Sequence, residues 1–472
     1  MAKKFISALL ALSICTSMLA AQSYAYSSDY VRMNDNVSFS MTNASYWIEK
    51  SQGDTMFGSG SETVLRLPDE IERINKKNPM VESAGDTELS MYEAEDTIDG
   101  SFLRAIFSEI HVPGSPEDCY LGGKPTTAAY WEKLKNNADM DNVPDEIPVR
   151  YGYSTARSSL RLFPSYDFIG EDKDDRFYDV NVMSEYMPFR PLLILHESKD
   201  KQWYYVMFEG YSGWVDKKYV AECPDREDWL GRMAPEDFLV VTGREIRLQD
   251  DVRSPSLSGQ LIPMGTKLPL VKLSDAPRMI NDRETTGCYI VKLPVRKPDG
   301  MITDKYSLIS IKEDVHVGYL EYTSENVLRL AFKRLGDRYG WAGLNHSNDC
   351  SGITGEIFRC FGFSLPRVSS QIAAYKGVDT KDLSDMTDEQ KLGVLASAEP
   401  GSILFFKGHI MIYLGMDNGD PYCISATGTY LKDGSDEDSA VDTNSVIITN
   451  MSKTYRSNGD SWLTNLSAVI TL

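Results

Sequence analysis

The sequence predicts a multidomain protein with a mixed, partly helical N-terminal region, two small antiparallel β-barrels in the middle and an α+β unit at the C-terminal end. Three observations lead to this prediction. The chain has 472 residues, 42% of them hydrophobic and 11% aromatic, enough for about three domains of roughly 150 residues each. Its middle part consists of short apolar strands separated by turns. After residue 323 the apolar residues take up helical spacing.

The charge balance excludes one class of function. The chain carries 49 Lys and Arg against 69 Asp and Glu, so its formal net charge is -20. A nucleic-acid-binding protein that works through a basic surface needs the opposite balance. We therefore expect no nucleic-acid partner.

The first 25 residues have the pattern of a secretory signal peptide. Two lysines precede an uncharged apolar run at residues 5–21, and the small residues Ser23 and Ala25 stand where signal peptidase reads the chain. Removing the two lysines leaves 47 basic against 69 acidic residues, a net charge of -22. We expect an exported protein, periplasmic or extracellular. No second membrane segment follows, so we expect no stable membrane insertion after signal cleavage.

The region from residue 26 to 145 is acidic and mixed in pattern. Apolar spacing predicts short helices over residues 68–75 and 128–134. No residue pattern in this region points to chemistry.

Short strands rich in Val, Tyr, Phe and Trp then follow in two groups. The first group comprises residues 159–164, 192–197, 203–208 and 213–215. The second group comprises residues 238–243, 264–270 and 289–294. Such spacing is typical of small antiparallel barrels, and we predict two of them in tandem.

A thiol and an imidazole stand at the starts of two elements in the C-terminal unit. Cys350 begins a stretch with helical apolar spacing, and His409 stands at the entrance to a predicted strand at residues 409–415, next to another at 401–406. Because the helix dipole and free amides favour a thiolate, we expect a lowered pKa for Cys350. A helix-borne thiol facing a strand-borne imidazole is the arrangement that Cys-His acyl-transfer enzymes need. Taken alone, a cysteine such as Cys350 is more often a buried thiol than a nucleophile, and His409 also fits an ordinary strand histidine.

Four sequence blocks follow each other in the order found in the NlpC/P60 cysteine peptidases. They are YGWAG at 339–343, DCSG at 349–352, LPRVSSQ at 365–371 and GHIMIYLG at 408–415. The chain therefore resembles this family, which implies a papain-like α+β catalytic domain. The two barrels resemble the paired bacterial SH3 domains of the subgroup that cleaves the bond between γ-D-glutamate and a diamino acid in peptidoglycan peptides.

The resemblance implies a division of the chain into five parts. These are a signal peptide at 1–25, an N-terminal stabilising domain at 26–145, SH3-like barrels at 146–225 and 226–322, and the NlpC/P60 peptidase domain at 323–472. The six cysteines after residue 25 lack the spacing of zinc ligands, and we expect no metal and no cofactor.

Carried over residue by residue, the resemblance implies that Cys350 is the nucleophile. His409 is then the base that takes the thiol proton and later protonates the leaving amine. The backbone N–H of Cys350, together with the Tyr339 hydroxyl, is expected to hold the developing oxyanion. Ser425 stands where the family usually has a histidine that orients the imidazole. A serine hydroxyl can accept the imidazole N–H, but it is shorter and brings no basicity.

The subgroup implies a muropeptide substrate with a free N-terminal L-Ala, followed by γ-D-Glu and a diamino acid. Asp349 is expected to bind the substrate amine, because a carboxylate that caps the helix with one oxygen keeps the other free. Tyr211 of the first barrel either closes this end of the cleft or packs the barrel. Trp341, Ser351 and Ser369 complete the expected substrate-binding set, although Trp341 also suits a domain junction and Ser369 a structural loop.

Two other functions stay open on the sequence alone. One is an N-acetylmuramoyl-type amidase on the same scaffold, which the blocks at 339–343 and 349–352 disfavour. The other is a non-catalytic muropeptide-binding protein with a degraded triad, for which Ser425 is the support.

Overall fold

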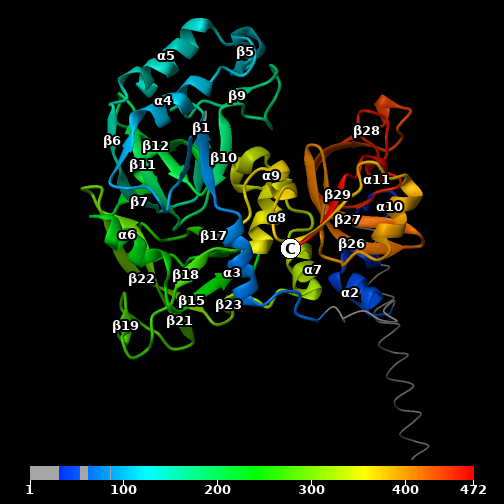
Figure 1. Ribbon diagram of the computed structural model, residues 1–472. Coiled ribbons are helices and arrows are strands. Elements are labelled where there is room, and N and C mark those ends of the chain that lie inside the picture. The colour runs from blue at the N-terminus through cyan, green and yellow to red at the C-terminus, as the bar shows by residue number, and fades with distance from the viewer. Residues whose placement is uncertain (1–30, 54–61, 85–86) are drawn as a thin grey trace, which may run out of the picture.

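The computed structural model describes residues 31–53, 62–84 and 87–472. The expected signal peptide at residues 1–25 lies outside them. Among the described residues, no helix is both long and apolar enough to span a bilayer. The molecule has two halves, which meet at α8 (Cys350–Arg359) and α9 (Ser369–Ala373), in yellow at the centre of Figure 1.

The first half contains a seven-stranded antiparallel sheet with the order β10-β8-β13-β12-β11-β7-β14, which is called the first barrel below. Its strands are β7 (Arg150–Ser154), β8 (Ser158–Arg161), β10 (Val182–Tyr186), β11 (Pro191–Glu197), β12 (Trp203–Phe208), β13 (Tyr211–Asp216) and β14 (Val220–Glu222). Successive side chains of a strand point to opposite faces, so the sheet fills two cores. On β12, for example, Tyr204 packs in one core and Tyr205 in the other.

A second β unit follows, below the first barrel in Figure 1. Its three-stranded sheet has the order β18-β15-β23, and hairpins β16-β17, β19-β20 and β21-β22 surround it. The strands are β15 (Phe238–Val241), β16 (Glu245–Arg247), β17 (Leu261–Pro263), β18 (Lys267–Pro269), β19 (Met279–Ile280), β20 (Arg283–Glu284), β21 (Cys288–Arg296), β22 (Ile302–Ser310) and β23 (Val315–Val317). The core of the unit is made almost wholly of Leu, Ile and Val side chains.

The N-terminal region divides between the two halves of the molecule. Helices α2 (Ala44–Gly53) and α3 (Pro68–Lys77) pack on the C-terminal domain, where the rings of Trp47 and Tyr422 lie 5.3 Å apart. The later elements cover the first barrel, where Phe107 stacks on Trp214 at 6.3 Å. These elements are β1 (Val81–Ala84), β2 (Thr87–Ser90), β3 (Thr97–Asp99), α4 (Gly100–Glu109), β4 (Tyr120–Leu121), β5 (Lys124–Pro125), α5 (Ala128–Ala138) and β6 (Glu146–Pro148). The predicted helices at 68–75 and 128–134 are therefore present as α3 and α5.

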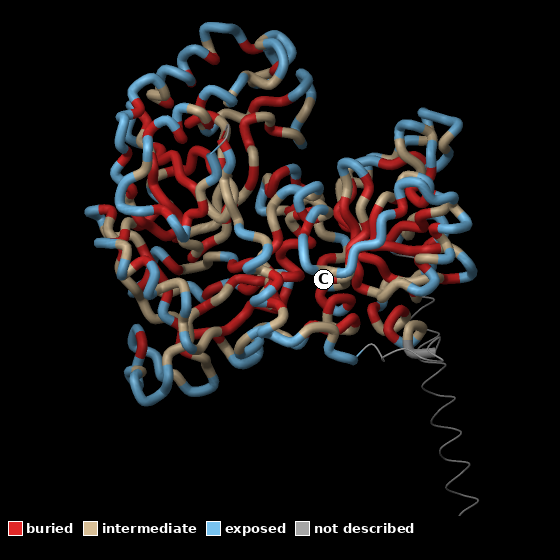
Figure 2. Tube along the Cα trace, viewed as in Figure 1, coloured by how far each residue is buried: buried red, intermediate tan, exposed pale blue. Residues whose placement is uncertain are grey.

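The C-terminal domain is built on a six-stranded antiparallel sheet with the order β24-β29-β25-β26-β27-β28. The strands are β24 (Asp379–Asp382), β25 (Ile403–Phe406), β26 (His409–Asp417), β27 (Asp420–Leu431), β28 (Ala440–Asn450) and β29 (Ala468–Thr471). Alternate residues of β26 enter different cores: Ile410 and Ile412 meet α7 (Ser324–Phe332) and α8, whereas Met411 and Tyr413 meet α10 (Asp388–Leu395) and α11 (Trp462–Asn465). Figure 2 shows the buried segments concentrated in the strands of both halves and in the helices between them.

Candidate active site

Cys350 is the first residue of α8. The Asp349 side chain caps the helix by accepting the backbone N–H of Gly352 at 2.8 Å, as the sequence predicts. The apolar side of α8 is buried against the sheet, with Ile357 and Phe358 in the same core as Ile410 of β26. Packing of the helix therefore fixes the thiol beside the strand that begins with His409.

His409 is held from several sides. Its Nε2 atom lies 3.0 Å from the Oγ atom of Ser425 on β27, and that hydroxyl lies 3.1 Å from Oγ1 of Thr427. The ring also packs against Phe406 and Trp462, at centroid distances of 5.4 and 5.1 Å, and these two rings contact each other at 5.7 Å. Because Nε2 faces Ser425, Nδ1 is the ring nitrogen left for the thiol.

The electrostatic setting keeps both groups neutral at neutral pH. Burial raises the pKa of Cys350 to about 12, with a further rise from the Asp349 charge, and the backbone N–H of Ile410 only partly opposes it. Burial lowers the pKa of His409 to about 4, and Arg456 acts in the same direction. The expected lowering of the thiol pKa is therefore wrong in direction, because desolvation and a neighbouring carboxylate outweigh the helix amides.

The Asp349 carboxylate is fully engaged. Arg367 donates to Oδ1 at 3.1 Å and to Oδ2 at 2.6 Å. Oδ2 also accepts the backbone N–H of Ala342 at 3.1 Å, and Oδ1 accepts the Ser351 hydroxyl at 3.2 Å. Although burial opposes ionisation, the charge and hydrogen bonds of Arg367 hold the pKa of Asp349 below its usual value. The expectation that one carboxylate oxygen stays free is wrong, because Arg367 and Ala342 occupy it.

The first barrel forms one wall beside these residues. Tyr211, Ser351 and Arg367 line the same pocket of about 120 Å³. The Tyr211 hydroxyl donates to the backbone carbonyl of Met183 at 3.1 Å, so the polar end of this side chain is already bonded within the barrel. Arg367 Nε donates to the Ser184 hydroxyl at 2.8 Å, which ties the barrel to the residue that pairs with Asp349.

Tyr339 and Trp341 lie next to each other around Tyr178 of the first barrel, at ring distances of 6.4 and 5.6 Å. Trp341 remains 43% exposed. Burial and the nearby Asp349 charge raise the pKa of Tyr339, so its hydroxyl keeps its proton and can donate it in a hydrogen bond. Ser369 is the first residue of α9, and within the described residues its side chain makes no hydrogen bond.

The sequence comparisons concern this same region. A model described as NlpC/P60 family matches residues 336–458, which include Cys350, His409 and Ser425. The C-terminal domain is an NlpC/P60 domain. A second model, described as SH3 domain of the SH3b1 type, matches residues 162–216 in the first barrel. The predicted family resemblance and the multidomain fold class are thus confirmed.

Relatives of known sequence or structure extend this result. The chain is 33% identical over 105 residues to "Probable endopeptidase p60" of Listeria welshimeri. The matched stretch makes up 20% of this chain and only 17% of the length of that protein. A solved NlpC/P60 endopeptidase from Photobacterium damselae subsp. piscicida covers 91% of this chain and 96% of its own, with a TM-score of 0.64 and 17% identity. The match to an NlpC/P60 family protein from Bacillus cereus covers 67% of this chain and 98% of that one, with a TM-score of 0.44 and 16% identity. The Photobacterium structure shows that the fold is shared well beyond the NlpC/P60 domain.

Several residues around the NlpC/P60 site are absent from the sequence-based set, among them Arg367, Phe406 and Trp462, and also Thr427, Tyr178 and Arg456. Thr427 lies two residues beyond Ser425 on β27, so the period of a strand offered a signal for it. Tyr178 and Arg456 gave no such signal in the sequence. Tyr178 reaches the site from the connection between β9 (Ile169–Gly170) and β10, and Arg456 from the segment before α11. Their positions follow from tertiary packing.

Proposed function

We propose that this protein is a cysteine endopeptidase of peptidoglycan-derived peptides that cleaves the bond between γ-D-glutamate and a diamino acid. The observation that carries the proposal is the contact between His409 Nε2 and Ser425 Oγ. His409 begins β26, and this strand packs directly on the helix that begins at Cys350. The name of the Listeria relative, a probable endopeptidase, supports the reaction class. The shared SH3b and NlpC/P60 domains support a cell-wall substrate.

The chemistry begins from a neutral pair. His409 Nδ1 takes the Cys350 proton as the sulfur attacks the scissile carbonyl, and the imidazolium then protonates the leaving amine. The backbone N–H of Cys350 and the Tyr339 hydroxyl hold the negative charge on the carbonyl oxygen. Water next hydrolyses the thioester, with His409 again acting as the base. Ser425 keeps Nε2 protonated and fixes the ring, which favours an active enzyme over a peptide-binding protein with a degraded triad.

A free N-terminal L-Ala remains part of the proposed substrate. Asp349 lies beside the nucleophile, and Tyr211 walls the adjoining pocket. Because Arg367 already pairs with Asp349, an ammonium group would join an existing ion pair rather than neutralise a lone carboxylate. We therefore propose a preference for the free amine that is weaker than an unpaired carboxylate would give.

Digestion of defined muropeptides tests the proposal. The full chain is incubated with L-Ala-γ-D-Glu-diamino acid peptides and with the same peptides attached to N-acetylmuramic acid, and the products are identified by mass spectrometry. We expect release of L-Ala-γ-D-Glu from the free peptides. Release of an intact peptide from the muramoyl group would instead show an amidase, and intact substrate in all samples would show a binding protein.

A further inference from the structure

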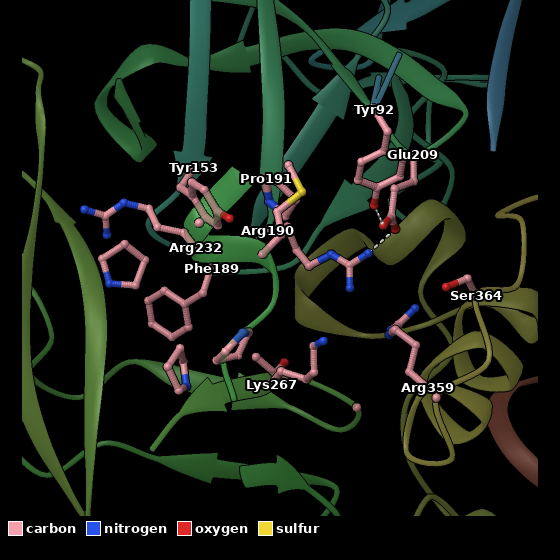
Figure 3. A pocket seen from close by; sticks show the side chains of 18 of the residues that line it. Tyr92, Tyr153, Phe189, Arg190, Pro191, Glu209, Arg232, Lys267, Arg359 and Ser364 are labelled. Carbon is pink, nitrogen blue, oxygen red and sulfur yellow. Dashed lines mark hydrogen bonds and ion pairs between the residues drawn. The ribbon is translucent and has the colours of Figure 1, made fainter. Parts of the chain in front are cut away.

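A larger cavity adjoins the pocket beside Tyr211, at the junction of several units, and the two share the lining residues Arg190, Glu209 and Arg359. Its volume is about 610 Å³. It is bounded by the first barrel, α6 (Arg226–Met233), the second β unit and the C-terminal end of α8, as Figure 3 shows. Cys350 and Arg359 are nine positions apart on α8, about 13 Å along the helix axis. The proposed peptidase reaction makes no use of this cavity.

Three basic side chains gather around a single carboxylate in the cavity. Arg190 forms an ion pair with Glu209, which also accepts the Tyr92 hydroxyl. The charges of Lys267 and Arg359 also help to lower the pKa of Glu209. Figure 3 shows both side chains directed into the space below Arg190. Within the part of the chain that the structure describes, neither Lys267 nor Arg359 has a hydrogen bond or an ion pair through its side chain. Their charges are balanced only at longer range, that of Arg359 by Glu356 and Glu209 and that of Lys267 by Glu209.

The other charges of the lining balance each other. Arg232 contacts Asp228 at 2.8 Å and Asp304 at 2.6 Å, and Lys292 lies 3.5 Å from Asp304. The complete lining therefore has five Lys or Arg against three Asp or Glu, an excess of two positive charges (5 - 3 = 2). In a chain of net charge -20, this local excess is the reverse of the general balance.

The close contacts that hold both groups in place are not ion pairs. The Lys267 ammonium lies over the rings of Phe238 and Tyr319, at 5.0 and 5.6 Å. Gly265, at φ +76°, lies so close to Arg359 that an added Cβ would come within 2.8 Å of the arginine Cβ and 3.3 Å of its Nε. Burial lowers the pKa of Arg359 to about 10, so the guanidinium stays charged at neutral pH. A fixed, half-desolvated charge of this kind gains more from an anion than a solvated surface charge does.

We propose that this cavity binds a small phosphate monoester, with its doubly charged head group on a ring-sized apolar body. The head group lies between Arg359 and Lys267, and the body contacts the apolar part of the lining. That part consists of Phe189, Pro269, Pro294, Tyr319 and Phe363. The lining comes from the first barrel, the second β unit and the NlpC/P60 domain, so the bound anion stabilises their packing.

Phenyl phosphate is the probe, titrated calorimetrically into the full chain carrying Cys350→Ala, so that a reactive thiol plays no part. We expect saturable binding at low ionic strength, at least tenfold weaker binding of the monoanion benzoate, and no measurable binding of phenol. Arg359→Gln and Lys267→Gln should each weaken phenyl phosphate binding at least tenfold. The exposed cations Arg278 and Lys312 lie elsewhere on the second β unit, and Arg278→Gln and Lys312→Gln should leave the affinity unchanged.

The melting temperature gives an independent readout. Without ligand, Arg359→Gln should melt close to the parent protein, because the Arg359 side chain makes no hydrogen bond or ion pair that the substitution would break. Phenyl phosphate should raise the melting temperature of the parent and of both controls, and not that of Arg359→Gln or Lys267→Gln. Equal stabilisation of all five proteins, or no binding to the parent at millimolar phenyl phosphate, would overturn the proposal. These outcomes are independent of muropeptide cleavage, since the protein tested has no thiol nucleophile.

Discussion

Arg367 forms a two-point ion pair with Asp349, the residue directly before Cys350. The same arginine donates to Ser184 of the first barrel. One guanidinium thus connects the cap of the helix that begins at Cys350 with a neighbouring domain. Its removal should affect both the fold and the reaction.

Arg367→Gln should lower the free energy of unfolding by about 3 kcal/mol, because it leaves the buried Asp349 carboxylate without its counter-charge. Urea denaturation measures this change, and the peptidase rate should fall at least tenfold as the start of α8 shifts. Arg329→Gln is the matched control, since its pair with Glu325 is exposed on the arginine side and should be worth only about 0.5 kcal/mol. Equal losses in the two variants would argue against a structural role for the Arg367 pair.

Cys350→Ala and His409→Ala should each abolish hydrolysis of L-Ala-γ-D-Glu-diamino acid peptides while circular dichroism stays native. The controls are Cys288→Ala and His316→Ala, which change the same residue types in the second β unit. Both should retain the parental rate. More than a few per cent of that rate in either active-site variant would show that the nucleophile or the base is a different residue.

Ser425→Ala should slow turnover several-fold, in line with the loss of one hydrogen bond worth about 1 kcal/mol. Thr427→Val removes only the neighbour of the Ser425 hydroxyl, so its effect should be smaller. Ser425→His restores the residue type usual in the family and should match or exceed the parental rate. An unchanged rate in Ser425→Ala would mean that Phe406 and Trp462 suffice to orient the ring.

The pH dependence of kcat/KM should be unusually broad. With the pKa of His409 lowered to about 4, the neutral imidazole needed as base persists far below the ordinary pKa of 6.5, and activity should fall only as pH approaches 4. With the pKa of Cys350 raised to about 12, ionisation of the free thiol should cause no change near pH 9.

The same neutral pair governs stability and thiol reactivity. Since the pKa of His409 is lowered in the folded protein, the contribution of this residue to stability is complete above pH 6.5 and is lost as pH falls through about 4.

Iodoacetamide should alkylate Cys350 more slowly at pH 8 than it alkylates glutathione. An acid limb near pH 6.5 together with rapid alkylation would indicate a preformed thiolate–imidazolium pair.

N-acetylation of the substrate amine should reduce kcat/KM by about tenfold, equivalent to about 1.4 kcal/mol. The loss is modest because Arg367 already neutralises Asp349. Asp349→Asn should shrink the difference between free and acetylated peptide chiefly by slowing cleavage of the free one, provided the helix remains capped. Equal rates on the two peptides would remove Asp349 from substrate recognition.

Local sequence signals predict much of the site and less of its electrostatics. Cys350 at a helix start and His409 at a strand start follow from residue spacing, and both are found there. The engagement of Asp349 does not, because Arg367 follows it by 18 positions and meets it only through the fold. The direction of the Cys350 pKa shift likewise depends on burial by other elements, which no local pattern reports.

The division of the N-terminal region is a further example. The helix at 68–75 is predictable from its own apolar spacing, but its packing on the C-terminal domain is not. Ile71 and Ile74 share a core with Phe363, whereas Phe107 joins the first barrel. The choice between these two cores depends on which apolar surface lies within reach of each helix.

The packing of α2 on the last domain has a consequence for the order of folding. Asn34 donates to the carbonyl of Ile448, and Tyr422 donates to that of Asn36, across separations of 414 and 386 residues. The ribosome makes β27 and β28 only after the barrels are complete, so until then Trp47 lacks the surface that covers it. Contacts of such long range close slowly, and the open chain exposes apolar side chains meanwhile. The sheet that carries His409 and Ser425 is therefore covered on this side only once residues 34–47 have met β27 and β28.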